Sequence, residues 1–406
     1  MSADEQRLAL ALRRLYALAP GGMKPGLAAM EEACSLHGHV ESAFPVIHVA
    51  GTNGKGSTCA MVEAMALAAG LRVGMTTSPH LSRFSERIRL NGAPIADGSL
   101  ADVLERALDT RVFLTFFEAA MLAAFLAFRD AHVDLAIVEV GLGGRLDATN
   151  VVPEPVASAL VSVGLDHCEY LGNTLAKIAS DKAHVAKRGR PFVLGPALAL
   201  EAREAAYRVA NERGARILEA CDAPVSDTLS LSLRGAHQVQ NAQVALRLGE
   251  LAGLSPRACA EGLRTAKWPG RFELLATPEG PVLLDGAHNE AGMRALLATL
   301  ASEGLHPRAA VFGAMGDKDW RTTLTALAGV VASRIYLAPA GRRAASSEEL
   351  SRVFPGFHAH SMAEALAEAR TLAGPAGLVL VTGSLHVVGE ARSVLLGLPR
   401  DPPVAL

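Results

Sequence analysis

The sequence has few cysteines, no long apolar run and no excess of charge of either sign. Its five cysteines are scattered and form no C-x-x-C pair, which argues against a disulfide framework and against a structural zinc site. No run of about eighteen apolar residues is present to span a bilayer. Residues 1–15 mix charged and apolar positions and predict an amphipathic helix rather than a signal peptide. We therefore expect a cytoplasmic protein whose cysteines are buried free thiols.

The charge balance argues against partners that attract proteins through general electrostatics. The 406 residues include 39 lysines and arginines against 41 aspartates and glutamates, for a formal net charge of -2. A chain so balanced has no general attraction to nucleic acid or to an anionic membrane, and we expect neither partner. Any phosphate group must then be bound at a local site.

The order of apolar segments predicts an α/β fold with two domains. Short apolar runs, such as residues 133–140, alternate with alanine-rich helical patterns, which is typical of βαβ units and a mostly parallel sheet. Proline and glycine cluster in residues 268–281, where the regular pattern lapses. We therefore expect a larger domain over residues 1–275 and a smaller, Rossmann-like α/β domain over residues 276–406. Ligands of such sheets bind at the carboxyl ends of the strands, where we expect every motif below.

The clearest local signal is a glycine-rich string between a predicted strand and a predicted helix. Residues 45–70 read PVIHVAGTNGKGSTCAMVEAMALAAG. The glycines let backbone N–H groups turn toward a phosphate, the helix N-terminus adds partial positive charge, and Lys55 can reach the outer phosphates. A tight strand-to-helix turn without a ligand is the alternative. The string predicts that the N-terminal domain is a P-loop-type ATPase domain.

The string departs from the usual P-loop pattern at two positions. Val49 occupies the first glycine position, and Gly56 stands where serine or threonine normally follows the lysine. These departures argue against the loop of a generic motor or GTPase.

Nine motifs in one register carry a resemblance that covers nearly the whole chain. The first is GTNGKGS (51–57), which is typical of the ATP loop of the Mur ligase superfamily. The others are TSPHLSRFSERIRLNG (77–92), TFFE (115–118), EVGLGGRLDATN (139–150), GLDH (164–167), DKA (181–183), PGRFE (269–273), DGAHN (285–289) and TGSLHVVGE (382–390). Together they resemble the bacterial folylpolyglutamate synthase/dihydrofolate synthase family, and TSPHL with EVGLGGRLDATN separates that family from the cell-wall Mur ligases.

The resemblance implies a ligase that adds L-glutamate to dihydropteroate, giving dihydrofolate, and to reduced folates, giving polyglutamates, through an acyl phosphate. ATP would be the co-substrate, with one or two Mg²⁺ ions and a monovalent cation as a further candidate, and the chain would be a monomer. Three alternatives stay open: a monofunctional folylpolyglutamate synthase, another Mur-type amino-acid ligase, and a P-loop switch or motor. A cell-wall ligase should carry a UDP-binding N-terminal domain, whereas the first predicted strand begins at Pro45.

Four positions match the family's metal site: Ser78, Glu139, His167 and Lys182. In the family the lysine is carbamylated and can bridge metal ions. Glu139 ends an apolar strand, where an unpaired buried carboxylate is costly, and a core acid satisfied by hydrogen bonds is the alternative. Taken alone, His167 would be a capping or core histidine, and Lys182 a helical lysine on a solvated face.

The resemblance assigns a further set of residues to ATP and to catalysis. Arg271 lies in the predicted hinge, where a guanidinium can match a phosphate edge; an exposed linker arginine is the alternative. Asp285 could bind the ribose or cap the next helix. The ATP positions are Asn53, Gly54, Lys55, Gly56, Ser57, Asn241, Arg271 and Asp285, and the catalytic positions are Lys55, His167, Lys182 and Arg271.

The remaining matches concern the pterin and glutamate. Phe117 could stack on the flat pterin, although core packing explains it equally well, and Asp147 could accept hydrogen bonds from its amino-pyrimidine edge. His288 and Ser384 are candidates for holding glutamate, because each precedes a predicted helix whose N-terminal amides suit a carboxylate. The pterin positions are Phe117, Glu118, Leu146, Asp147 and Ala148, with residues 21–26 (GGMKPG) as a further wall of that pocket.

Overall fold

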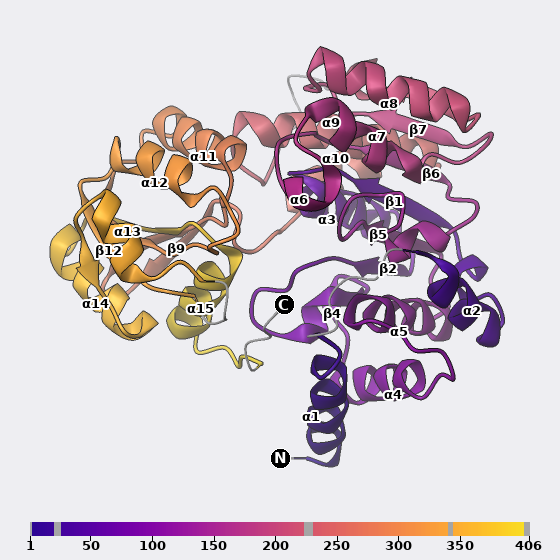
Figure 1. Ribbon diagram of the computed structural model, residues 1–406, viewed down its shortest axis with the longest axis horizontal. Helices are drawn as coiled ribbons and strands as arrows, with labels where there is room; N and C mark the ends of the chain where they lie inside the picture. The colour runs from indigo at the N-terminus through magenta and orange to yellow at the C-terminus, as the bar shows by residue number, and fades with distance from the viewer. Residues whose placement is uncertain (1, 20–25, 223–229, 340–343, 402–406) are drawn as a thin grey trace.

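Two β-sheets, one in each half of the chain, organise the fold (Figure 1). The computed structural model describes residues 2–19, 26–222, 230–339 and 344–401. Within these residues the first sheet has eight strands, in the order β4-β3-β2-β5-β1-β6-β7-β8, and the second has six, in the order β13-β12-β11-β14-β10-β9. The expected α/β fold with a second, smaller sheet domain is confirmed.

The first sheet is parallel from β2 across to β8, and β3 and β4 add an antiparallel edge. Its strands are β1 (Val46–Ala50), β2 (Val73–Thr76), β3 (Ile88–Leu90), β4 (Ala93–Pro94), β5 (Leu135–Glu139), β6 (Ala157–Leu160), β7 (Pro191–Leu194) and β8 (Arg216–Glu219). Every residue of β1, β5 and β6 is buried, as expected for parallel strands that are covered on both faces.

Helices cover both faces of this sheet. They are α1 (Ala3–Tyr16), α2 (Ala28–Leu36), α3 (Lys55–Ala68), α4 (Asp97–Leu108), α5 (Phe116–Asp130), α6 (Cys168–Leu171), α7 (Leu175–Lys182), α8 (Leu200–Glu212), α9 (Ala236–Leu251) and α10 (Pro256–Thr265). Strand side chains alternate between the faces: Val46 packs in a core with α1, α2, α4 and α5, whereas Ile47 and Val49 pack in a core with α3, α9 and α10.

The second sheet is also covered on both faces. Its strands are β9 (Glu273–Thr277), β10 (Gly280–Leu284), β11 (Pro307–Phe312), β12 (Ser333–Tyr336), β13 (Phe357–His358) and β14 (Leu378–Thr382), and only the β9–β10 pair is antiparallel among them. The helices are α11 (Glu290–Ser302), α12 (Trp320–Ala328), α13 (Ser347–Val353), α14 (Met362–Ala373) and α15 (Leu385–Leu396). One apolar core joins the sheet to α11 and α12, and another joins it to α14 and α15, as in a doubly wound domain.

The second domain also returns to the first near its C-terminal end (Figure 1). The Asp401 N–H donates to the Ser82 carbonyl at 2.9 Å, and the Asp401 carboxylate accepts from the Phe84 N–H at 2.6 Å. The Ser82 hydroxyl donates to the Gly389 carbonyl of α15 at 3.3 Å. The segment after β2 is therefore attached to the C-terminal domain.

Several details differ from the sequence predictions. The predicted division between residues 275 and 276 falls inside β9, which pairs with β10, so a division before Glu273 keeps the second sheet whole. TFFE (115–118) opens α5 after α4 instead of following a strand. All five cysteines are free, but Cys168 and Cys221 are exposed and only three are buried. Among the described residues, none of the helices combines the length and hydropathy of a membrane span.

Candidate active site

The loop between β1 and α3 has the geometry of a phosphate loop. Gly54 adopts a positive φ of 81°, and a Cβ at this position would lie 2.3 Å from Oδ1 of Asn241, so only glycine fits. The Thr52 N–H donates to the Ser162 carbonyl at 2.9 Å, and the Asn53 N–H donates to the Ser162 hydroxyl at 2.9 Å. The segment after β6 therefore holds the loop in place, with the N-terminus of α3 directly behind it.

Steric contact explains why glycine stands at position 56, where serine or threonine is usual. A Cβ at Gly56 would lie 2.7 Å from Nε1 of Trp268 and 2.9 Å from two ring carbons. Trp268 precedes the interdomain segment, so a hinge residue packs directly on the first turn of α3. The departure from the P-loop pattern makes room for this indole.

Lys55 and Glu139 face each other beneath the loop. The Lys55 ammonium donates to the carbonyls of Gly51 at 3.0 Å and Thr52 at 3.3 Å, and lies 3.9 Å from Oε1 of Glu139. Burial raises the pKa of the Glu139 carboxyl, and the charge of Lys55 opposes the shift. The Ser78 N–H donates to Oε2 of Glu139 at 3.2 Å. The structure thus brings Ser78 and Glu139 together at the ends of the neighbouring strands β2 and β5.

Lys182 lies in the interior, not on a solvated face. The residue is 5% exposed, and its ammonium donates to the Gly51 carbonyl of the phosphate loop at 3.1 Å. Burial, with the charge of Lys55 as the next cause, lowers the pKa of Lys182 to about 7. This lysine is therefore present to a large extent as the neutral amine near neutral pH.

His167 lies beside the same group of charges. It adopts a left-handed conformation (φ 51°, ψ 39°) at the N-terminus of α6. Burial lowers its pKa to about 4, Asp166 opposes the shift, and the charges of Lys318, Lys182 and Lys55 add to it. The ring is therefore neutral at physiological pH, which is the form that binds a metal ion.

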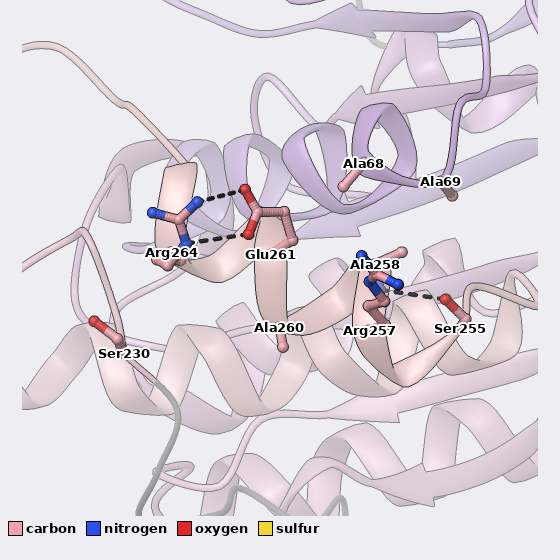
Figure 2. Close-up of a pocket in the computed structure, with 9 residues that line it drawn as sticks. All are labelled: Ala68, Ala69, Ser230, Ser255, Arg257, Ala258, Ala260, Glu261 and Arg264. Atoms are coloured by element: carbon pink, nitrogen blue, oxygen red, sulfur yellow. Dashed lines mark hydrogen bonds and ion pairs between the residues drawn. The ribbon is translucent and has the colours of Figure 1, made fainter.

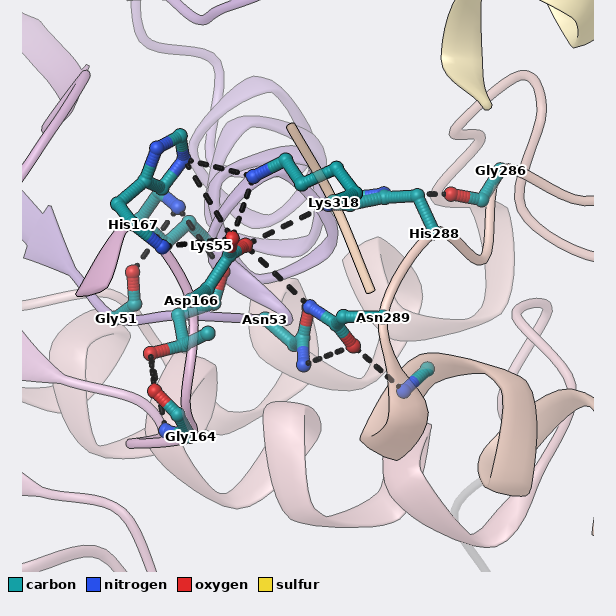
Figure 3. A network of polar contacts seen from close by, with 12 residues as sticks. Gly51, Asn53, Lys55, Gly164, Asp166, His167, Gly286, His288, Asn289 and Lys318 are labelled. Carbon is teal, nitrogen blue, oxygen red and sulfur yellow. Dashed lines mark hydrogen bonds and ion pairs between the residues drawn. The ribbon is translucent and has the colours of Figure 1, made fainter. Parts of the chain in front are cut away.

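Asp166 is the centre of a polar network that joins the two domains (Figure 3). Its Oδ1 accepts from the Lys318 ammonium at 2.5 Å, and its Oδ2 lies 3.8 Å from Nε2 of His288. The same ammonium is 3.2 Å from Nε2 of His167. Burial opposes ionisation, but hydrogen bonding from His288 and the charge of Lys318 hold the pKa of Asp166 well below its usual range.

Neither Asp166 nor Lys318 was among the sequence-predicted site residues. Asp166 lies within the GLDH motif, in which only the histidine was assigned. Lys318 follows β11 in the string GAMGDKD, and its place after a strand was the signal that could have indicated it.

A second interdomain contact lies beside this network (Figure 3). Asn53 of the phosphate loop donates to the Asn289 side-chain oxygen at 3.2 Å, and Asn289 donates back to the Asn53 oxygen at 3.0 Å. Asn289 also caps α11 by accepting from the Gly292 N–H at 2.9 Å. The cap of this helix is therefore Asn289, and not Asp285 as one reading of the sequence suggested.

Asp285 stabilises the interdomain segment. Its carboxylate accepts from the N–H groups of Phe272 and Ala287, both at 2.9 Å. Burial raises the pKa of Asp285, and the charge of Arg271 opposes this shift. A Cβ at Gly286 would lie 2.6 Å from Nη1 of Arg271, so the hinge arginine lies against the β10–α11 loop.

The predicted residue Asn241 belongs to a buried amide chain behind the phosphate loop. Its Nδ2 donates to Oε1 of Gln238 at 2.9 Å, and Nε2 of Gln238 donates to the Ser57 hydroxyl at 3.3 Å. Sequence reasoning missed Gln238, which links α9 to the first turn of α3.

The two residues that were predicted to bind the substrate glutamate, His288 and Ser384, take part in different contacts. Nδ1 of His288 lies 2.9 Å from the Gly286 carbonyl, and its other nitrogen faces Asp166. Ser384 is buried and caps α15 by accepting from the His386 N–H at 3.1 Å. Both lie at helix N-terminal ends of the second domain, as the motifs predicted.

Two of the residues predicted to bind the pterin, Glu118 and Asp147, stabilise their own segments of the chain. Glu118 forms a capping box with Thr115, from which its carboxylate accepts two hydrogen bonds. Asp147 is buried and accepts from the N–H groups of Leu142 at 2.8 Å and Thr149 at 3.0 Å. The carboxylates of both residues are therefore engaged with their own segments.

The other predicted pterin residues offer apolar surface. The Phe117 ring covers Gly141, where an added Cβ would lie 2.4 Å from Cζ of the ring. Leu146 is 41% exposed, whereas Ala148 is buried. Residues 21–25 of the GGMKPG string lie outside the described part of the chain.

A separate surface pocket of about 660 Å³ lies away from this site (Figure 2). Its lining residues are Ala68, Ala69, Ser230, Ser255, Arg257, Ala258, Ala260, Glu261 and Arg264. It adjoins the end of α3 opposite to the phosphate loop, and its Arg264 is paired with Glu261 at 2.6 Å. None of the predicted site residues lines it.

The side chains of Glu139 and Ser78, beside the phosphate loop, suit a magnesium ion that also takes ligands from a nucleotide, and not a metal centre formed by protein side chains alone. Within the described residues, no group of three histidine, cysteine, aspartate or glutamate side chains could hold a metal. A buried carboxylate and a serine hydroxyl, together with nucleotide phosphates, are ligands of the kind that Mg²⁺ uses in phosphoryl-transfer enzymes. The residues present therefore fit this ion.

A phosphate loop, Lys55 beside it and Lys318 from the second domain form a site of the kind that binds a nucleotide between two α/β domains. Residues 270–385 match the family model described as Mur ligase, glutamate ligase domain. The chain is 35% identical to the dihydrofolate synthase/folylpolyglutamate synthase of Bacillus subtilis (strain 168) over 92% of this chain and 96% of that protein. It belongs to the dihydrofolate synthase/folylpolyglutamate synthase family.

Solved structures agree with this membership. The structure of Escherichia coli FolC in complex with DHPP and ADP superposes with a TM-score of 0.86, at 33% identity over 96% of this chain and 98% of that chain. The Yersinia pestis CO92 bifunctional enzyme complexed with AMPPNP and a Mn ion gives a TM-score of 0.86 at 32% identity, with the same coverage. Both structures thus hold a nucleotide, and the second also holds a Mn ion.

The chain spans about half the length of two other curated relatives, to which it is 37% identical. Both are named as probable bifunctional folylpolyglutamate synthase/dihydropteroate synthase, from Haloferax volcanii and Halobacterium salinarum.

Proposed function

We propose that the chain catalyses ATP-dependent addition of L-glutamate to dihydropteroate, giving dihydrofolate, and to reduced folates, giving polyglutamates. The observation that supports this best is the group of three lysines around His167 and the phosphate loop. Lys55 and Lys182 of the first domain both donate to the Gly51 carbonyl, and Lys318 of the second domain lies 3.2 Å from Nε2 of His167. The positive charges of Lys55 and Lys318 suit the negative charge of a nucleoside triphosphate and of an acyl phosphate.

The reaction has two steps. A carboxylate oxygen of the pterin substrate attacks the γ-phosphorus of ATP, and the bond to the β-phosphate oxygen breaks to release ADP. The amine of glutamate then attacks the acyl carbon, which releases inorganic phosphate and a proton. Both steps depend on positioning and on neutralising charge, for which Lys55 of the phosphate loop and Arg271 of the hinge are the candidate groups.

Ser78, Glu139 and His167 would hold Mg²⁺. The ion would neutralise phosphate charge. Glu139 is already anchored by the Ser78 N–H, so its carboxylate has a fixed orientation, and the neutral ring of His167 has a nitrogen free of a proton.

Lys182 is proposed to carry a carbamate in the active protein. Only a neutral amine adds CO₂, and the pKa of about 7 makes that form abundant. The carbamate would exchange a positive charge for a negative one next to Gly51. A monovalent cation would be a further ion bound near the negative charge of this carbamate.

The substrates are proposed to approach from opposite sides. Phe117, Leu146 and Ala148 would contact the pterin, whereas Glu118 and Asp147 would act by shaping its pocket, since their carboxylates are already bonded. Glutamate would bind in the second domain between His288 and Ser384.

A substrate panel tests the proposal. Purified protein would receive ATP, Mg²⁺ and glutamate with dihydropteroate, with a reduced folate, or with neither, and ADP and products would be measured by mass spectrometry. Glutamylation of both acceptors supports the bifunctional activity, and glutamylation of the reduced folate alone favours the monofunctional alternative. ATP hydrolysis that needs neither acceptor would favour a switch or motor.

The setting of the enzyme is also proposed. All five cysteines are free, which is the state expected in a reducing cytoplasm. We propose a cytoplasmic monomer, because both domains that form the candidate site come from a single chain.

A further inference from the structure

A buried series of hydrogen bonds connects strand β1 to the loop that carries Leu146, Asp147 and Ala148. His48 of β1 is 0% exposed, and its Nε2 lies 2.7 Å from the Thr149 hydroxyl. That hydroxyl donates to Oδ1 of Asp147 at 2.5 Å. His48 belongs to β1, the strand that leads into the phosphate loop, but it has no part in binding phosphate.

The hydrogen-bond directions follow from the chemistry of the groups. The Thr149 hydroxyl gives its only hydrogen to the Asp147 carboxylate, so Nε2 of His48 must be the donor to that hydroxyl. The imidazole is then the Nε2–H tautomer. Burial lowers the pKa of His48 to about 3, which agrees with a neutral ring.

This arrangement leaves one ring nitrogen unused. Nδ1 of His48 is buried and has no hydrogen-bond partner within the described residues. An unpaired buried nitrogen destabilises a fold, so an apolar side chain would serve the core better. The histidine therefore has a task other than stability.

Asp147, at the opposite end of this series of hydrogen bonds from His48, controls the shape of the loop. Asp147 accepts from the N–H groups of Leu142 and Thr149 as well as from the Thr149 hydroxyl. These bonds close residues 142–149 around one carboxylate. Gly141, just before this loop, lies under the Phe117 ring, and Leu146 extends from its tip with 41% exposure.

We propose that His48 is a positioning residue for the pterin substrate, which acts through Thr149 and Asp147 on the loop that lines the pterin pocket. The proposal deepens the function given above and rests on it for the identity of the ligand. His48 touches neither substrate nor nucleotide.

The test compares variants that remove a hydrogen bond with variants that keep it. His48→Leu and Thr149→Val remove the donor and the hydroxyl. His48→Gln keeps an N–H donor near the same place, and Thr149→Ser keeps the hydroxyl. The KM for dihydropteroate should rise about five- to tenfold in the first pair, with the KM for ATP within about twofold of wild type, and the second pair should be close to wild type.

A structural role alone is separated by a matched control and by a second readout. Ser158 of β6 pairs with His48 in the sheet and is equally buried, so Ser158→Ala loses a buried polar group without touching the loop. Hydrogen exchange of the peptide that covers residues 141–150 should accelerate in Thr149→Val and not in Ser158→Ala.

Each outcome decides the proposal. Equal increases of both KM values, or accelerated exchange of this peptide in Ser158→Ala as well, would overturn it. Unchanged exchange in Thr149→Val would overturn it too, even if an unstable His48→Leu could not be measured. A wild-type protein that does not glutamylate any pterin would instead contradict the proposed function, and that result is read before any variant is compared.

Discussion

Lys182 gives a quantitative prediction about covalent modification. A carbamate forms only from the neutral amine, and burial with the nearby charge of Lys55 lowers the pKa of Lys182 from 10.5 to about 7. We predict that wild-type protein in bicarbonate buffer carries one carbamate on this residue. Lys182→Arg should lack it and should lose ligase activity.

The structure sets the size of the effect. Values of 10.5 and about 7 differ by about 3,000-fold in acidity. At pH 7 the neutral fraction therefore rises from about one molecule in 3,000 to about half. Modification and activity should both decline as the pH falls below about 7, because the folded protein then protonates Lys182.

The same shift affects stability with a defined sign. Between pH 7 and 10.5 the unfolded chain binds more protons at this lysine than the folded chain does. The contribution of Lys182 to the free energy of unfolding therefore increases as the pH rises through this window. Below about pH 7 the buried amine is protonated in the folded protein, and Lys182 there destabilises the fold most.

Carbon-13 NMR of protein in ¹³C-bicarbonate provides the assay. The carbamate signal should be present at pH 8 in wild type, decrease through pH 7 and be absent in Lys182→Arg. Lys177→Arg, on the exposed side of the same helix, is the matched control and should keep the signal. Absence of the signal in active wild-type protein, or its persistence in Lys182→Arg, would refute the argument.

Three further substitutions test other contacts of the site. Lys55→Ala should lower turnover about a thousandfold, while its melting temperature stays within a few degrees of the wild-type value. Near-normal turnover in this variant would refute the assignment of the phosphate loop. Gly56→Ala should raise the KM for ATP about tenfold, since its Cβ would meet the Trp268 ring at 2.7 Å, and adding Trp268→Leu should restore it; failure to restore would mean that the indole does not dictate the glycine. Lys318→Met removes the cation that pairs with the buried Asp166 carboxylate and should lower the free energy of unfolding by about 3 kcal/mol, as measured by urea denaturation. Adding Asp166→Asn should recover most of that loss, and equal destabilisation in single and double variants would contradict the ion-pair account.

The sequence predicted those parts of the site that depend on local pattern. The phosphate loop lies between an apolar strand and a helix, and both elements are visible in residues 45–70. Ser78 follows β2 and Glu139 is the last residue of β5, and parallel neighbouring strands bring such positions together at one edge of the sheet.

Contacts between distant segments were not accessible in this way. Lys318 and Asp166 are 152 residues apart, and their meeting depends on how the two domains are oriented, which no local pattern encodes. Lys182 looked exposed because Lys177 and Lys187 flank it, yet the β1–α3 loop covers its amine. Strands β3 and β8 are short and contain charged residues, so no apolar run in the sequence marks them.

The activity that we propose for this protein joins glutamate to a pterin-bearing carboxylate and consumes ATP. The most direct measurement is product mass after incubation with ATP, Mg²⁺, glutamate and dihydropteroate, with ADP measured in the same sample. We predict dihydrofolate and ADP in equal amounts, and a further glutamate on a reduced folate supplied in its place. ADP formation without a glutamylated product from either acceptor would contradict the account.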